Sequence, residues 1–402
     1  MTDIIDRPRY VQQIVPHIDT PNIKVLTGVR RCGKSTILKL VEERIRARHQ
    51  EANFVCLNME STDALTIRTP EDLLNKFSHL APRKDERTYF FLDELQQVPG
   101  WEDAVNALRV SWNCDIYLTG SNSRMLSGDL ATNLAGRYVE FRIQPLSFAE
   151  FVDLYGSSKS ESPTDLFQKY VRHGGLPGLK YFNFQPEPIA QYMSTLYDST
   201  VLKDVVEHNA IRNVDLFNRV TRYAFANIST TFSANSVAKF LKLEKRTIST
   251  DTVLNYLEYC AQAFLLDQAP RFDVKGKAAM LSREKYYCAD HGYRIALGLS
   301  NEAEIERVLE NIVYQEMRSR GFEVSVGTVE EKEVDFIAQK GSETIYLQVS
   351  YLLASPDTIE REFGSLKAVS DNFPKYVLSM DNFDLSRDGI EHKNIVDFLL
   401  NI

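Results

Sequence analysis

The chain has 402 residues, of which 44% are hydrophobic and 25% are charged, and its formal net charge is -8. This length exceeds a single ordinary core and predicts two to four domains. The acidic balance argues against a protein that binds polyanions over its whole surface, although it allows a local basic patch. No apolar run reaches the roughly 18 to 20 residues that span a bilayer, and no signal-peptide pattern is present, so we expect a cytoplasmic protein without membrane contact.

The cysteines are scattered singly along the chain. There are five of them, with no CxxC pair and no paired spacing. Neither a zinc site nor a disulfide framework is therefore indicated.

The most specific motif lies at residues 28–35, where GVRRCGKS follows a short apolar strand pattern and precedes a helical pattern. It matches GxxxxGK[ST], the phosphate-binding P-loop signature, at every required position. A chance match in a glycine-containing turn is the alternative, but strand, loop and helix stand in the demanded order. We predict a nucleotide site formed by Gly28, Arg30, Arg31, Cys32, Gly33, Lys34, Ser35 and Thr36.

Each residue type that the motif requires in this loop has a physical task. Gly28 and Gly33 permit backbone angles that a side chain forbids, so successive N–H groups can curl around phosphate oxygens. Lys34 reaches the β and γ phosphates, and the Ser35 hydroxyl ligates Mg²⁺ at the positive end of a helix. Arg30 or Arg31 is expected to contact either the γ-phosphate or a neighbouring subunit. The cofactors predicted are therefore ATP and Mg²⁺.

A second decisive stretch, TYFFLDE, covers residues 88–94. Continuous hydrophobicity is typical of a buried parallel strand, and ligands bind beyond the carboxyl end of such strands. Asp93 and Glu94 stand at that end. About 60 residues after a P-loop, this pattern predicts that Asp93 holds Mg²⁺ and that Glu94 orients or deprotonates the attacking water.

A further buried strand is predicted over residues 115–122, DIYLTGSN. In additional-strand ATPases such a strand lies between the two strands just described, and its terminal polar residue touches the γ-phosphate or the water. Asn122 is our candidate for this sensor, and Ser121 is the second candidate. An asparagine that merely caps the next turn is the alternative.

An arginine follows the sensor strand in LAGRY, residues 134–138. An arginine in this place can neutralise transition-state charge as a finger, in cis or across a subunit interface. A surface ion pair of Arg137 is the alternative.

Together, TGVRRCGKS, FLDELQ, LTGSNS, LAGRY and PLSFAEF resemble a bacterial and archaeal ATPase family of the AAA+ class, related to the STAND-type ATPases. The resemblance covers nearly the whole chain. It implies an α/β fold with an AAA+ core at residues 1–150, a helical lid at 151–230, a winged helix at 231–300 and a nuclease-like domain at 301–402. It also implies a homo-oligomer such as a hexameric ring.

The predicted winged helix consists of helices starting near Ser233 and Thr250, followed by strand-like arms at 263–271 and 275–279. Its second helix is expected to expose polar side chains suited to DNA. The expected contacts are Thr247, Ser249, Thr250, Thr252, Asn255 and Tyr256, flanked by Lys245, Arg246, Arg271, Lys275 and Lys277. Docking to a protein is the alternative role of such a module.

The order of helix and strands after residue 301 resembles the PD-(D/E)xK nuclease core. Active members hold Mg²⁺ with an aspartate and a third-strand acid, and a lysine two residues later helps to activate water. Here Asp335 is present, but Gln348 and Ser350 stand at the other two positions. Glu310 or Glu316 is the substitute we consider. We expect Asp335 to mark a vestigial metal site and the domain to bind without cutting.

These patterns predict an ATP-hydrolysing AAA+ protein that binds and remodels DNA, including branched DNA, through its winged helix and nuclease-like domain. The alternative is a STAND-like signalling switch that acts on a protein partner in defence or toxin-antitoxin control. DNA-stimulated hydrolysis favours the first and tightly held nucleotide without such stimulation favours the second.

Overall fold

The computed structural model describes residues 5–126, 134, 136–156, 161–274, 276, 278–330 and 332–400. The chain divides into two compact units, residues 1–143 with 262–264 and residues 144–261 with 265–402. The end of the first unit lies close to the expected end of the ATPase core. The lid, winged helix and nuclease-like domain, expected as three domains, instead fall within one compact unit.

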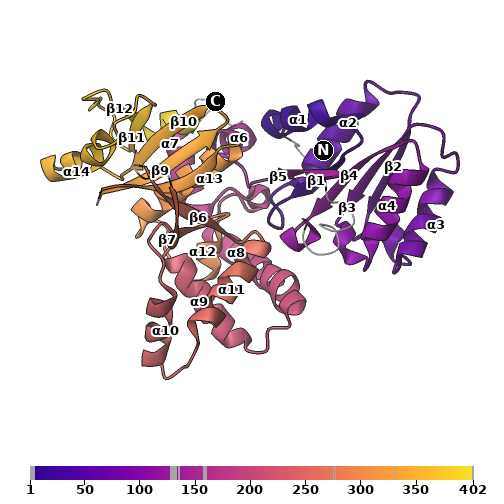
Figure 1. The fold of residues 1–402 in the computed structure, drawn as a ribbon, viewed down its shortest axis with the longest axis horizontal. Coiled ribbons are helices and arrows are strands. Elements are labelled where there is room, and N and C mark those ends of the chain that lie inside the picture. The colour runs from indigo at the N-terminus through magenta and orange to yellow at the C-terminus, as the bar shows by residue number, and fades with distance from the viewer. Residues whose placement is uncertain are drawn as a thin grey trace. The chain divides into compact units, whose positions relative to one another are not determined.

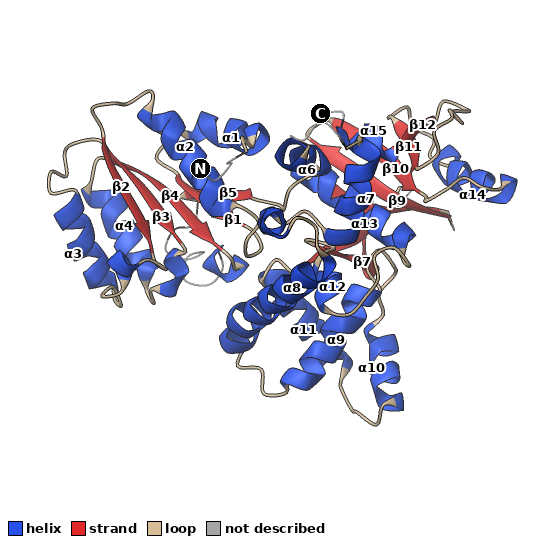
Figure 2. Cartoon of the chain, turned by 180° about the vertical axis from the view of Figure 1, so that it is seen from behind, coloured by secondary structure: helices blue, strands red, loops and turns tan. Residues whose placement is uncertain are grey.

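The amino-terminal unit is an α/β layer structure with a five-stranded sheet. All pairings are parallel and the strand order is β2-β3-β4-β1-β5. Figure 2 shows helices on both sides of this sheet. The strands are β1 (Ile23–Thr27), β2 (Asn53–Asn58), β3 (Thr88–Asp93), β4 (Cys114–Gly120) and β5 (Tyr138–Arg142), and the helices are α1 (Pro8–Ile14), α2 (Lys34–Arg46), α3 (Pro70–Leu80) and α4 (Trp101–Ser111).

The helices cover both faces of this sheet and bury its central strands. Every residue of β1 and of β3 is buried, as expected of central parallel strands covered on both faces. The apolar sides of α3 and α4 pack into one core cluster through Phe77 and Trp101. The α1 and α2 helices lie on the other side of the sheet (Figure 1).

The strand order determines where the site lies. Because β4 lies between β1 and β3, the segments that follow these three strands meet at one edge of the sheet. The prediction that the 115–122 strand lies between the P-loop strand and the Asp93 strand is confirmed.

The opposite end of the sheet contains a fully buried ion pair. Lys24 Nζ lies 2.5 Å from Asp115 Oδ1, and both side chains are 0% exposed. Asp115 Oδ2 also accepts hydrogen bonds from Tyr117 Oη and from the backbone N–H of Asp19. Burial lowers the pKa of Lys24, and Asp115 opposes this shift. The pair therefore depends on both partners remaining in place.

We predict that Asp115→Ala destabilises the amino-terminal unit by about 3 to 5 kcal/mol, because it leaves the Lys24 ammonium buried without a counter-charge. Denaturant unfolding of the full chain measures this. The exposed Glu51→Ala is the control and is expected to change stability by less than about 0.5 kcal/mol. Equal effects of the two substitutions would show that the buried pair contributes nothing.

The second unit begins with helices and continues into a mixed sheet. Its helices are α6 (Phe148–Tyr155), α7 (Pro163–His173), α8 (Pro186–Thr200), α9 (Val214–Ala226), α10 (Ala234–Leu243), α11 (Thr250–Gln262), α12 (Tyr293–Ala296), α13 (Ile305–Ser319), α14 (Pro356–Lys367) and α15 (Ile395–Leu400), with a π-helical segment Val201–Glu207 after α8. Ser147 caps α6 in a capping box with Glu150. Of the helices described, none combines the length and apolar character needed to cross a membrane.

The sheet of this unit has seven strands in the order β12-β11-β10-β9-β8-β6-β7. They are β6 (Leu266–Asp273), β7 (Ala278–Cys288), β8 (Glu323–Val329), β9 (Lys332–Lys340), β10 (Glu343–Val349), β11 (Lys375–Ser379) and β12 (Glu391–Asn394). Tyr287 of β7 stacks on Tyr314 of α13 at a centroid distance of 4.1 Å, and both contact Phe336 of β9. These rings fix β7, α13 and β9 against one another.

The predicted arms of the winged helix belong to this sheet. The β6 and β7 strands form an antiparallel hairpin, as expected, but β6 also pairs with β8 in parallel. The boundary expected at residue 300 therefore separates strands of one sheet and is wrong as a boundary between compact units. Local pattern could predict the hairpin but not its pairing with a strand about 50 residues later.

The HGGLPG turn at residues 173–178 is held by a buried carboxylate. Asp290 accepts hydrogen bonds from the N–H groups of Gly175 and Gly292, at 2.8 and 2.7 Å. A Cβ on Gly175 would lie 2.5 Å from the Leu146 carbonyl oxygen, so a larger residue does not fit there. Burial raises the pKa of Asp290 to about 7, and the two backbone hydrogen bonds oppose this shift.

Candidate functional site

The P-loop curves from β1 into α2 on left-handed backbone. Gly28 has φ +142° and Gly33 has φ +107°, and Arg31 between them has φ +64°. A Cβ on Gly28 would lie 2.2 Å from the carbonyl oxygen of Ile143, so only glycine fits. The loop can therefore present backbone N–H groups at the amino end of α2, which is the arrangement that binds phosphate.

Lys34, the first residue of α2, is directed toward the loop. Its Nζ donates hydrogen bonds to the carbonyl oxygens of Gly28 and Val29, at 2.9 and 3.2 Å. The side chain is buried, and Nζ lies 4.0 Å from Glu94 Oε1. The ammonium thus stands between the loop and the carboxylate, where it can reach a phosphate and the reacting water.

Asp93, the last residue of β3, lies at the same edge of the sheet as the P-loop. It is buried, and its carboxylate accepts hydrogen bonds from Asn58 Nδ2 at 2.9 Å and from Thr119 Oγ1. Burial raises the pKa of Asp93, while hydrogen bonds from Thr119 and Ser35 oppose the shift. The contact with Ser35 brings together the two side chains predicted to hold Mg²⁺.

Donors and charge at this point fit a magnesium ion bound with nucleotide. Ser35 offers a hydroxyl oxygen and Asp93 a carboxylate, which are hard oxygen ligands of the type that Mg²⁺ prefers together with phosphate oxygens. Bound there, the ion would neutralise charge on the phosphates.

Glu94 is held in an unusual conformation. Its backbone has φ +54° and ψ +39°, the left-handed region that non-glycine residues rarely occupy, and its N–H donates to Thr119 Oγ1 at 2.9 Å. Its Oε2 accepts from Gln96 Nε2 at 2.5 Å and lies 3.4 Å from Ser121 Oγ. The carboxylate is thereby oriented at the same edge as the P-loop.

The Gln96 contact was missed by sequence reasoning, because a glutamine two residues after the acid pair carries no motif. Its amide also lies 3.4 Å from Ser121 Oγ. We predict that Gln96→Ala lowers kcat about tenfold with little change in ATP affinity, since about 1.5 kcal/mol of orientation is lost from a charged group. Gln97→Ala is the matched control, because Gln97 is exposed and bonds to Glu60 instead. An unchanged kcat in Gln96→Ala would remove this residue from the account.

The sensor candidates follow β4 directly. Both Ser121 and Asn122 are buried, and Ser121 contacts the Glu94 carboxylate. The position of these two residues therefore supports the prediction that the end of β4 takes part in the site. The contact shown is that of Ser121, and the role of Asn122 stays a prediction.

Arg7 is a second residue that sequence reasoning missed. It precedes α1, is buried to 1% exposure, and donates from Nη1 to the carbonyl oxygen of Cys32 at 3.0 Å. This hydrogen bond ties the start of α1 to the P-loop. Arg7 thus supports the loop conformation from outside.

Arg30 and Arg31 differ in their surroundings on the P-loop. Arg30 Nη1 lies 3.8 Å from Glu60 Oε1, while Arg31 is exposed. Cys32 and Thr36 occupy the loop and the first turn of α2 as expected. The exposed Arg31 is the freer of the two arginines to meet a phosphate or another subunit.

Arg137 does not lie at the P-loop of its own chain. It precedes β5, and its carbonyl accepts from the N–H of Ile23 at the start of β1. The P-loop begins beyond the other end of β1, about 13 to 16 Å away for a strand of five residues. Its Nη1 is instead 3.4 Å from Asn106 Oδ1 of α4. The cis alternative for the finger is therefore wrong on geometry, and the trans alternative stays a prediction.

Residues predicted for DNA contact are only partly exposed. Tyr256 is buried against Phe217, and Arg271 is buried in hydrogen bonds and ion pairs with Thr231, Thr328 and Glu333. Both expectations of exposure are wrong, because these side chains stabilise the unit's interior. Arg246 pairs with Asp215, Thr247, Ser249 and Asn255 are exposed, and Thr250 and Thr252 are half-buried. Lys275 and Lys277 lie outside the described residues.

Asp335 of β9 lies at a pocket of about 520 Å³ within the second unit. Glu310 of α13 also lines this pocket, whereas Glu316 does not and pairs with Arg320 at 2.7 Å. Of the two substitutes considered from sequence, only Glu310 is close to Asp335. Gln348 accepts from the backbone N–H of Asp335 at 3.2 Å.

Comparison with known proteins assigns the segment that carries this P-loop site to a described family of domains. Residues 20–152 match the family model described as AAA domain, and residues 164–303 match a domain of unknown function (DUF8612). An uncharacterized protein of Haemophilus influenzae is 35% identical over 99% of both chains, and one of Methanocaldococcus jannaschii is 30% identical over 91% of this chain and 81% of its own. A Walker-type ATPase of Pyrococcus abyssi has a similar fold, with a TM-score of 0.52 and 17% identity over 74% of this chain and 97% of that one.

Proposed function

Because the chain belongs to the family of these Haemophilus and Methanocaldococcus proteins, with an AAA domain followed by DUF8612, we propose that it hydrolyses ATP with Mg²⁺ and uses the cycle to act on DNA. The observation that carries the ATPase proposal is the gathering of Lys34, Asp93 and Glu94 at one sheet edge. This arrangement supplies the three functions that phosphoryl transfer needs, namely phosphate binding, a metal ligand and a residue that orients water.

In the proposed reaction, the P-loop N–H groups and Lys34 bind the phosphates and stabilise the charge of the transition state. Glu94 accepts a hydrogen bond from the attacking water and orients it in line with the γ-phosphorus. Gln96 and Ser121 hold the Glu94 carboxylate in position for this step. Asn122 is proposed to contact the γ-phosphate from the end of β4.

Arg137 is proposed to complete the site of a neighbouring subunit in a homo-oligomer. Its exposure at the edge opposite its own P-loop is what a finger that acts in trans requires. The specific ATPase rate per chain is then expected to rise with protein concentration. A rate per chain that is constant across the range over which the oligomer forms would contradict the role in trans.

DNA is proposed to bind at the surface of α10 and α11. Lys242 in the last turn of α10 and Lys245 just after this helix are exposed, and they are followed by the exposed Thr247 and Ser249. Ammonium and hydroxyl groups of this kind contact phosphates, which position a protein on DNA. Arg271, which was expected beside this surface, is buried, so we expect moderate, salt-dependent binding.

The test is the ATPase rate of the full chain with linear, single-stranded and branched DNA and without DNA. We expect DNA to raise the rate and the double variant Lys242→Ala, Lys245→Ala to lose this rise while keeping the basal rate. Lys203→Ala, an exposed lysine in the same unit, is the matched control. A rate that none of the DNA forms changes would reject DNA as the ligand while leaving the ATPase proposal in place.

A signalling switch that acts on a protein partner is the second candidate. It is favoured by three large apolar side chains of α10 and α11 that are exposed, Phe240 at 45%, Leu243 at 85% and Leu254 at 46%. Exposed apolar groups of this size are more suited to a protein than to DNA. Nucleotide that copurifies with the chain, together with no DNA stimulation, would favour this candidate.

A further inference from the structure

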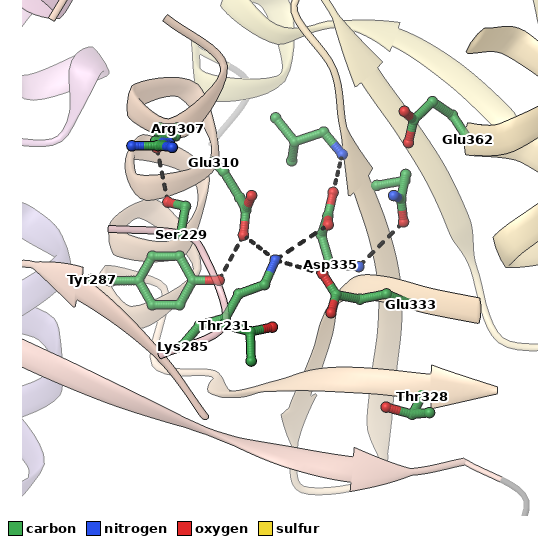
Figure 3. Close-up of polar contacts among 12 residues, drawn as sticks. Ser229, Thr231, Lys285, Tyr287, Arg307, Glu310, Thr328, Glu333, Asp335 and Glu362 are labelled. Carbon is green, nitrogen blue, oxygen red and sulfur yellow. Dashed lines mark hydrogen bonds and ion pairs between the residues drawn. The ribbon is translucent and has the colours of Figure 1, made fainter. Parts of the chain in front are cut away.

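The pocket at Asp335 is organised around a lysine that no motif pointed to. Lys285 lies on β7, and its side chain is 4% exposed. Its Nζ lies 2.9 Å from Glu310 Oε1, 2.7 Å from Glu333 Oε1 and 3.7 Å from Asp335 Oδ1. Figure 3 shows the ammonium at the point where these carboxylates from α13 and β9 converge.

The carboxylate oxygens around this point already have partners. Glu310 Oε1 also accepts from Tyr287 Oη at 2.7 Å, and Glu333 Oε2 accepts from Arg271 Nη2 at 2.5 Å. Asp335 Oδ2 accepts from the N–H of Val349 at 2.9 Å.

The other candidate ligands at the pocket are committed in the same way. The Gln348 side-chain oxygen accepts from the backbone N–H of Asp335. Glu362 pairs with Arg361 at 2.6 Å. Within the described ranges there is no cluster of three acidic, histidine or cysteine side chains arranged to take a metal ion. The Mg²⁺ that a PD-(D/E)xK resemblance implies therefore does not fit the residues present, and the assignment of Asp335 as a metal ligand is corrected.

Electrostatics agrees with a charged lysine in this place. Burial alone lowers the pKa of Lys285, but the carboxylates of Glu310, Asp335 and Glu333 outweigh it and the net pKa is raised. Burial raises the pKa of Asp335 well above its usual range, with the nearby Glu310 adding to the shift. Three acidic side chains thus share the two cations Lys285 and Arg271, and a divalent ion would have to displace an ammonium already paired.

We propose that the Lys285 ammonium takes the position that a divalent cation would occupy among Glu310, Glu333 and Asp335. The pocket at Asp335 therefore holds its three carboxylates together without a metal ion. It follows that the second unit binds its partner without metal-dependent cutting of DNA. It also follows that removal of the ammonium leaves a buried set of carboxylates with a vacancy for a cation, so Lys285→Ala should create a divalent-cation site.

The test is Mn²⁺ binding by the full chain, measured by calorimetric titration and by thermal unfolding in the absence of nucleotide. The wild type is expected to show no Mn²⁺-dependent rise in Tm that depends on Asp335. Lys285→Ala is expected to have a lowered Tm that Mn²⁺ raises again, with one ion bound per chain. Lys285→Ala combined with Asp335→Asn should lose that response. The same variants are also made with Asp93→Asn, which removes the predicted metal ligand near the P-loop, so that Mn²⁺ bound there is not mistaken for Mn²⁺ bound at Asp335.

Lys285→Met keeps the apolar stem and is the second variant in case Lys285→Ala does not fold. Recovery of folded protein by Mn²⁺ during refolding of either variant supports the proposal. An Asp335-dependent Mn²⁺ site in the wild type would overturn it, and so would Lys285 variants that Mn²⁺ neither binds nor restores. Cleavage of plasmid DNA by the wild type with Mn²⁺ or Mg²⁺, lost in Asp335→Asn, would overturn it as well.

Discussion

Replacing Glu94 by glutamine is expected to lower ATP turnover by roughly 10² to 10⁴-fold while leaving nucleotide binding intact. Glutamine keeps the shape of the side chain and its hydrogen bond to Gln96, but it removes the carboxylate that orients and accepts a proton from water. The Glu94 carboxylate accepts its hydrogen bonds from Gln96 and Ser121, and Lys34 remains in place to bind phosphate. Phosphate release under saturating ATP measures the rate, and equilibrium binding of a fluorescent ATP analogue measures affinity.

Two outcomes distinguish the roles of Glu94. A kcat that falls while affinity holds supports the assignment, and Glu71→Gln, an exposed acid in the first turn of α3, is the control that should behave as wild type. Near-normal hydrolysis by Glu94→Gln would mean that another group, such as Asn122, orients the water.

The second large effect is expected from Lys34→Ala, which should weaken ATP binding by roughly 10² to 10⁴-fold. The ammonium can make two charge-assisted hydrogen bonds to phosphate oxygens, each worth about 1.5 to 3 kcal/mol. The fold should survive, because the Lys34 side chain donates its hydrogen bonds to carbonyls of its own loop and its ion pair with Glu94 is a long one, at 4.0 Å. Equilibrium binding of labelled ATP provides the measurement.

Lys39→Ala is the matched control for this substitution. Lys39 lies on the same helix, one turn further on, and is exposed. It should bind ATP as the wild type does. If Lys34→Ala also bound ATP normally, the loop would have to hold the phosphates through its backbone alone, and the role assigned to the lysine would be wrong.

Much of the amino-terminal site could be predicted from sequence, because its chemistry is encoded locally. The glycines of the P-loop and the acid pair after β3 each need only a few adjacent residues to be recognised. Arg137 was recognised in the same way, but which edge of the sheet it occupies depends on the register of β5 against β1. Its exclusion from its own site therefore needed the structure.

The second unit was less predictable, since its chemistry depends on strands that are distant in sequence. Lys285 stands 50 positions before Asp335, within the predicted winged-helix domain but beyond its predicted strand-like arms. Only the pairing of β6 with β8 brings β7 into the sheet that carries the acid. Arg271 was expected on the DNA-binding surface for the same reason and is instead buried against Glu333. The types of residue in this unit could be read from the sequence, but the residues that they contact could not.

The two units together raise the question of whether nucleotide controls the ligand. If ATP at the P-loop and DNA at the second unit are coupled, each must change the affinity of the chain for the other, because coupling is reciprocal. Glu94→Gln offers a protein that holds ATP without consuming it, so affinity can be measured at equilibrium.

The most direct measurement is therefore the affinity of Glu94→Gln for labelled DNA by fluorescence anisotropy, with Mg²⁺ and ATP and without nucleotide, at one fixed salt concentration. We expect a change in Kd of about 5 to 150-fold between the two conditions, the range that a coupling of about 1 to 3 kcal/mol produces. An identical Kd in both conditions, or no DNA binding in either, would contradict the claim that this ATPase acts on DNA.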